Sequence, residues 1–115
     1  MKLCLNVGSI LARTGGPLQG MVRVFLHDSD ELATVYTLEG GDFVQAANPQ
    51  LLDNNARMQT LYFEAGFIDV EIRKYIGPEG YMSVSSPDTD FEIFDRFSYG
   101  FDMGDGNAVH AVDTI

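Results

Sequence analysis

The chain has 115 residues, of which 45% are hydrophobic, and this suffices for one small folded domain. Seventeen acidic residues against seven basic ones give a formal net charge of −10, which argues against nucleic acid or an anionic membrane as a partner. The sequence shows neither a signal peptide nor a run of about 20 apolar residues, and its single cysteine excludes an internal disulfide.

Alternation of apolar and polar residues predicts an all-β fold, because clusters of glycine, proline and asparagine separate the alternating runs at sandwich-like intervals. Strands are predicted at residues 2–7, 20–27, 33–38, 42–46, 60–64, 67–76, 81–85 and 91–97. Hairpins predicted at residues 37–43 and 76–82 favour antiparallel pairing. The expected fold is a single antiparallel β-sandwich of about seven to eight short strands.

The two ends of the chain differ from the middle, which is predicted to be the sandwich domain at residues 20–99. Residues 1–19 are expected to form an extended N-terminal arm and the first strand, with Cys4 as a buried thiol. In this arm, Ile10 and Leu11 would need a neighbour to bury them. Residues 100–115 contain three glycines and three aspartates and are interpreted as a linker-like tail that leads to a body outside the chain.

The strand at residues 67–76 has the most regular pattern. Aliphatic and charged side chains alternate along it: Ile68, Val70 and Ile72 against Asp69, Glu71 and Arg73. Because successive side chains point to opposite faces of a sheet, the aliphatic set is expected to face the core and the charged set to face solvent. The charged set, together with Arg57, would then be able to contact a neighbouring molecule.

Five aromatic residues lie within eleven positions: Phe91, Phe94, Phe97, Tyr99 and Phe101. On a regular strand Phe94 would face one side and the other four the opposite side. A buried aromatic row indicates core or a subunit interface, whereas an exposed row would suit the stacking of sugar rings. Together with Ile10 and Leu11, these residues are the candidate contacts with an oligomer partner or a larger particle.

The numerous carboxylates are interpreted as solvated surface. Asp88, Asp90 and Glu92 would share one face of a strand, which suits either calcium or an edge that discourages strand addition, and the second interpretation is preferred. Further acidic and amide groups near the C-terminus lack calcium-loop spacing: Asp102, Asp105 and Asn107. Since His27 and His110 adjoin no nucleophile motif, we predict no catalytic residue, no metal site and no cofactor.

Residues 17–75, about half of the chain, resemble the N-terminal domain of bacteriophage tail fibre and tail spike proteins. That family has, in order, a G-x-V-x-V strand, an A-x-V-Y strand, an N-P-x-x-L-D-x-x-G-R turn and a G-x-Y-x-V strand. The matching segments are GMVRVF at 20–25, ATVY at 33–36, Asn48-Pro49 with Leu52-Asp53 and Arg57, and GFIDV at 66–70. Transthyretin-like and carboxypeptidase-regulatory sandwiches show a similar order.

One position departs from the family pattern: Ala56 stands where the family has glycine before the arginine. Because Asn54 and Asn55 tolerate a left-handed backbone, the turn is expected to be kept with a shift of one residue. The resemblance implies a structural virion protein, not an enzyme, that is made in the bacterial cytoplasm. It would be a homotrimer that attaches a receptor-binding body to tail, neck or capsid proteins. The alternative is a carbohydrate-binding or regulatory β-sandwich module.

Overall fold

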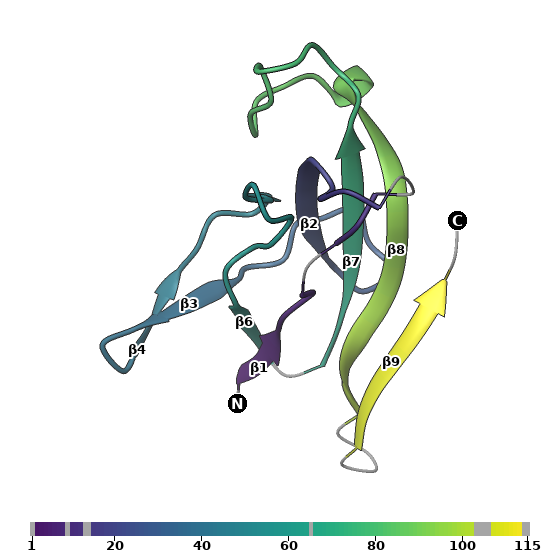
Figure 1. Cartoon of the computed structure of the whole chain (residues 1–115). Coiled ribbons are helices and arrows are strands. Elements are labelled where there is room, and N and C mark those ends of the chain that lie inside the picture. The colour runs from purple at the N-terminus through teal and green to yellow at the C-terminus, as the bar shows by residue number, and fades with distance from the viewer. Residues whose placement is uncertain (1, 9, 13–14, 65, 103–106, 114–115) are drawn as a thin grey trace.

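The computed structural model describes residues 2–8, 10–12, 15–64, 66–102 and 107–113, which form two antiparallel β-sheets (Figure 1). The first sheet contains, in spatial order, β1 (Lys2–Leu5), β6 (Leu61–Glu64), β3 (Tyr36–Glu39) and β4 (Asp42–Gln45). The second contains β5 (Gln50–Leu51), β2 (Gly20–Leu26), β7 (Phe67–Tyr75), β8 (Phe91–Asp102) and β9 (Asn107–Asp113). The sheets pack as a β-sandwich, which confirms the predicted fold class. No helix in the described ranges is long and apolar enough to cross a bilayer.

Most predicted strands are confirmed to within a few residues, and so is the predicted hairpin at residues 37–43. In that hairpin β3 and β4 are joined by Gly40 and Gly41, whose φ angles of 59° and 89° suit a tight two-residue turn. Two strands were not predicted. One is the two-residue β5, and the other is β9, which pairs with β8 along residues 96–102.

The strand predicted at residues 81–85 and the hairpin predicted at residues 76–82 are wrong. Residues 76–90 form a connection without strands, in which the short 3-10 helix η1 (Asp88–Asp90) precedes β8. Serine side chains compete for the backbone here: the hydroxyl of Ser83 accepts from the amide of Ser85, and the hydroxyl of Ser86 accepts from the amide of Ser83. Since η1 intervenes, Asp88 and Asp90 do not share a strand face with Glu92.

The core lies between the two sheets and is built from the alternation predicted for β7. Its largest fully buried side chains come from both sheets and from the segment before β2: Phe63, Leu5, Leu18, Leu61 and Val22. Ile68, Val70 and Ile72 face this core as expected. Cys4 is exposed instead of buried, because the neighbouring Leu5 points inward and successive residues alternate between faces.

The charged face of β7 contradicts the prediction that it is solvated. Asp69, Glu71 and Arg73 expose only 5%, 3% and 7% of their surface. They lie on the face of the five-stranded sheet that points away from the first sheet, where the neighbouring strands also bury Met21, Phe25 and Phe91. Both faces of β7 are therefore buried, one by aliphatic packing and the other by ion pairs and aromatic rings.

A β-bulge in β8 overturns the predicted aromatic row. Ile72 pairs with Asp95 but the next residue, Arg73, pairs with Ile93, so Phe94 is an extra residue on β8. Every side chain beyond it changes face. Phe91 therefore faces outward with Tyr75, whereas Phe97 and Tyr99 face inward and pack against the main core.

The segment from the Asn-Pro corner to Arg57 serves turn geometry, as predicted. The Asn48 side chain donates to the carbonyls of Val24 and Ala33 at 2.7 and 2.8 Å and accepts from the Val24 amide at 3.1 Å. Asp53 accepts from the amides at positions 55 and 57. The expected shift of the turn does not occur, because the left-handed residue is the fully buried Ala56, with φ 58°.

Candidate functional site

An apolar groove of about 390 Å³ lies between the N-terminal segment and β8. Its floor is core: Leu5 and Ile72 reach it from the two sheets. Its walls come from the described part of the N-terminal segment on one side and from the bulged half of β8 on the other. The lining side chains of the walls are Asn6, Val7, Ile10, Leu11, Phe94, Asp95, Phe97 and Tyr99. One carboxylate therefore lies among mainly apolar groups.

The N-terminal wall is held by backbone hydrogen bonds. The Ile10 amide donates to the Ala56 carbonyl at 3.0 Å, and the Ile10 carbonyl accepts from the Leu18 amide at 2.9 Å. These two hydrogen bonds hold Ile10 against the core, where it is 8% exposed, whereas the next residue, Leu11, is 58% exposed. At the opposite wall the Tyr99 hydroxyl donates to the Cys4 carbonyl at 3.0 Å and so connects β8 to β1.

The groove brings together five of the seven residues predicted as contacts: Ile10, Leu11, Phe94, Phe97 and Tyr99. Ile10 is buried by this chain itself, so its burial does not require a neighbouring molecule. Phe91 lies elsewhere, in a small cluster with Met21 and Tyr75 on the outer face of the second sheet. The side chain of Phe101 lies outside the described residues, as do those of Asp102, Asp105, Asn107 and His110.

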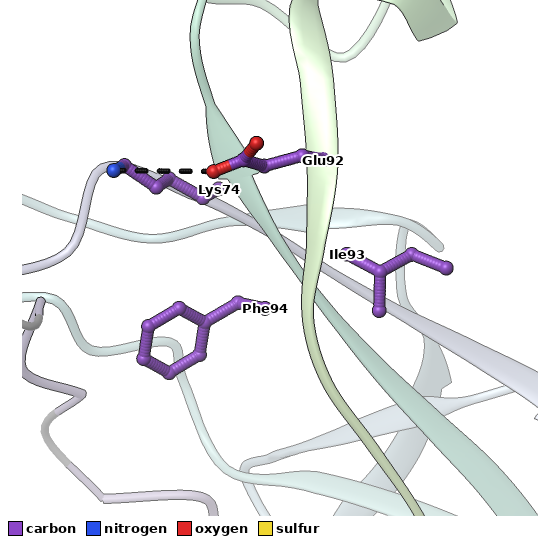
Figure 2. Close-up of a pocket in the computed structure, with 4 residues that line it drawn as sticks. All are labelled: Lys74, Glu92, Ile93 and Phe94. Carbon is purple, nitrogen blue, oxygen red and sulfur yellow. Dashed lines mark ion pairs between the residues drawn. The ribbon is translucent and has the colours of Figure 1, made fainter. Parts of the chain in front are cut away.

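A second, more polar hollow of about 340 Å³ adjoins the bulge. Figure 2 shows that Phe94 and the Lys74–Glu92 pair lie on one side of β8 and Ile93 on the other. The ammonium and carboxylate are 4.0 Å apart and both side chains are about half exposed, so this ion pair adds little stability. Phe94 therefore forms a boundary between the apolar groove and a solvated charged edge.

Glu71 is the centre of an ion-pair network on the outer face of the second sheet. Its carboxylate accepts from Arg23 Nε at 2.8 Å and lies 3.6 Å from Arg73 Nε and 4.0 Å from Arg96 Nη1. Arg73 also donates to the side chain and the backbone carbonyl of Asp88, both at 3.3 Å. One buried carboxylate thus joins three strands, and Arg73 connects this network to η1.

In the described part of the chain no further layer of strands or helices covers these charges, and aromatic rings shield them instead. The guanidinium groups of Arg23 and Arg96 lie 5.1 and 5.6 Å from the centroid of the Phe25 ring. Arg73 lies 4.9 Å from the centroid of Phe91. Cation–π attraction offsets part of the lost hydration, and the rings exclude water from Glu71.

Asp69 is the second centre of the network. Its carboxylate accepts from Ser98 Oγ at 2.8 Å, pairs with His27 Nδ1 at 2.9 Å and accepts from the Asp28 amide at 3.0 Å. Burial alone would raise the pKa of Asp69, but the hydrogen bonds from His27, Ser98 and Asp28 together lower it. The hydrogen bond to Asp69 raises the pKa of His27.

The hydrogen bonds around Asp69 hold neighbouring strands together, and their order differs from that of a Ser-His-Asp catalytic triad. Ser98 Oγ donates to the carboxylate and not to the His27 ring, so the histidine is not placed to take the proton of the hydroxyl. His27, Asp28 and Asp69 offer ligand atoms within 4.8 Å of one another, which is close enough for a divalent cation. However, both oxygens of Asp69 already accept hydrogen bonds, so we assign the cluster to the attachment of the turn after β2.

Stability is expected to vary with pH through this pair. The raised pKa of His27 contributes stability that is complete below the unfolded value of about 6.5 and is lost as the pH rises through the folded value. The lowered pKa of Asp69 contributes stability that is complete above the unfolded value of about 3.8. This stability is lost as the pH falls through the folded value. Urea titrations should therefore give the largest free energy of unfolding near pH 5.5, with a decrease toward pH 8.

The matched variant His27→Gln isolates the alkaline side of this profile. It removes the titrating ring but keeps a side chain that can donate to Asp69, so the decrease between pH 6 and pH 8 should become shallower. An identical slope in the wild type and in His27→Gln would contradict the role assigned to this pair.

The network was missed at the sequence level because its members are far apart: His27, Asp69 and Ser98 are separated by 42 and 29 residues. One signal was present. Aspartate and glutamate are unfavourable in the middle of a strand, so two of them within residues 67–76 indicate either full exposure or a specific set of partners.

Comparison of the chain with known protein families, with curated proteins and with solved structures finds no match.

Proposed function

We propose that this chain is a non-enzymatic assembly domain, the virion-anchoring β-sandwich of a phage tail or head fibre or spike. Three copies associate through the apolar groove and attach a receptor-binding body to the particle. The observation that carries this proposal is the groove itself, which gathers residues from the N-terminal segment and β8 around the exposed Leu11. Apolar side chains around such an exposed leucine are typical of a protein contact surface.

The turn after the Asn-Pro corner also supports the proposal. The tail fibre pattern has glycine before the arginine of this turn, and the corresponding Ala56 has a left-handed backbone with φ 58°. Asn48 and Asp53, two polar residues of the same pattern, make the hydrogen bonds that shape the corner and the turn. The motif residues therefore have geometric roles of the kind that a shared fold requires.

The carbohydrate-binding alternative loses the feature that motivated it. Phe91, Phe97 and Tyr99 do not form one exposed row, because the bulge sends Phe91 to the opposite face and all three pack against core clusters. A sugar ring would need an exposed aromatic face to stack on.

Leu11→Glu tests the groove as the contact between copies. A buried, unpaired carboxylate at an interface is costly, so this variant should shift the assembly to monomer under conditions where the wild type is a trimer. Sedimentation velocity gives the readout. Leu38→Glu is the matched control, because Leu38 is similarly exposed but lies on β3. Equal sedimentation of both variants and the wild type would contradict the assigned interface.

A further inference from the structure

The strand β4 forms an open edge of the first sheet. It is last in the strand order β1-β6-β3-β4, and all four of its residues are exposed. The hairpin of β3 and β4 extends away from the five-stranded sheet (Figure 1). Among the described residues, no strand pairs with the outer side of β4. Its backbone groups on that side are therefore available for a further strand.

The register of the hairpin identifies these backbone groups. In a two-residue hairpin the residues next to the turn exchange hydrogen bonds, and bonded pairs then alternate along the strands. The backbone amide and carbonyl of Val44 therefore point toward β3. The hydrogen bond from the Ala46 amide to the Val35 carbonyl, at 2.8 Å, continues this alternation. The amide and carbonyl groups of Phe43 and Gln45 point outward, toward the open edge.

Both faces of the edge offer apolar contact. Leu38 and Phe43 lie opposite each other on one face and are 49% and 45% exposed, and Val44 is exposed on the other face. The Phe43 ring packs edge-on against Tyr62, with ring centroids 5.2 Å apart. An incoming strand would therefore place alternate side chains against a preformed apolar surface.

Charge decides which kind of strand fits this edge. The hairpin of β3 and β4 contains Glu39 and Asp42 and no lysine or arginine. The ammonium of Lys2 lies 5.1 Å from the centroid of the Phe43 ring but is already paired with Glu64 at 2.8 Å. A second copy paired at this edge would bring the same Glu39 and Asp42 beside its own turn. A segment with basic side chains would instead gain an attractive interaction with Asp42 and Glu39 beside the turn.

We propose that β4 binds an extended basic segment of another protein as an added antiparallel strand. Valine-like residues of that segment lie opposite Phe43 and Gln45, and a lysine or arginine lies opposite Asp42. Main-chain hydrogen bonds supply affinity, and the alternating apolar contacts and charges supply specificity. This binding edge is separate from the groove, so it does not depend on the function proposed above.

A labelled peptide of alternating lysine and valine, KVKVKVK with blocked ends, tests this proposal by fluorescence anisotropy at about 0.15 M salt. The full chain should bind it, and Gln45→Pro should weaken binding by about tenfold or more because it removes an outward amide. Proline is tolerated there, since that amide makes no bond to β3. Gln45→Thr is the matched control, and it should bind like the wild type.

Two versions of the peptide separate strand pairing from attraction between opposite charges. N-methylation of the valines blocks the amides that face β4 and should abolish binding, whereas N-methylation of the lysines preserves both binding and net charge. Undetectable binding of the unmodified peptide, or equal binding to the wild type and Gln45→Pro, would overturn the proposal. An assembly of the wild type alone that Gln45→Pro dissociates would assign the edge to a second copy and would also overturn it.

Discussion

Glu71→Ala is expected to lower the free energy of unfolding by about 3–5 kcal/mol, the range for breaking a buried ion pair. Glu71 is 3% exposed, and three guanidinium groups from β2, β7 and β8 lie within 4.0 Å of its carboxylate. Its removal leaves these positive charges together without their shared partner. Arg73 is the most affected, because it is itself buried.

Chemical denaturation monitored by tyrosine fluorescence or circular dichroism measures this effect. Glu92→Ala is the matched control, since Glu92 is a half-exposed acid on β8 whose lysine partner is 4.0 Å away, and its loss should cost less than about 0.5 kcal/mol. Equal effects of the two substitutions would show that the network on the outer face does not stabilise the fold.

Gly20→Ala is expected to destabilise the protein by about 3 kcal/mol. A Cβ at this position would lie 1.9 Å from the carbonyl oxygen of Arg73, which belongs to the neighbouring strand. A backbone atom cannot rotate away as a side chain can, so β2 and β7 must separate locally. The separation would also disturb Met21, which is almost completely buried beside this contact.

Gly16→Ala provides the comparison for Gly20→Ala. No atom lies within 4 Å of a Cβ built on Gly16, and its φ is outside the left-handed range, so stability should change by less than about 0.5 kcal/mol. Thermal unfolding of both variants gives the measurement. A melting temperature of Gly20→Ala close to that of Gly16→Ala would contradict the close approach of β2 to β7.

The inner faces of the strands could be predicted because alternation reports them directly. Ile68, Val70 and Ile72 show period two and are core, and the glycine pair between β3 and β4 marks a tight turn. The outer face of β7 could not be predicted in this way. Its burial depends on aromatic rings from β2 and β8, and alternation within one strand contains no information about its neighbours.

In the candidate site, too, some features could be predicted from the sequence and others could not. Ile10, Leu11 and three aromatic residues of β8 line one groove, and the sequence draws attention to them because clusters of apolar residues beside glycine-rich or polar segments are visible in it. Their division between two faces was not visible, since one extra residue at Phe94 inverts every later position of β8. β-Bulges have no dependable local signature, so a parity argument fails beyond the first bulge.

The native mass of the full chain at micromolar concentration tests the proposed assembly most directly. Native mass spectrometry or light scattering should give three times the 12.7 kDa of one chain, and Leu11→Glu should give a single chain mass. A wild-type protein that remains a 12.7 kDa monomer across this concentration range would contradict association through the groove and, with it, the proposed anchoring function.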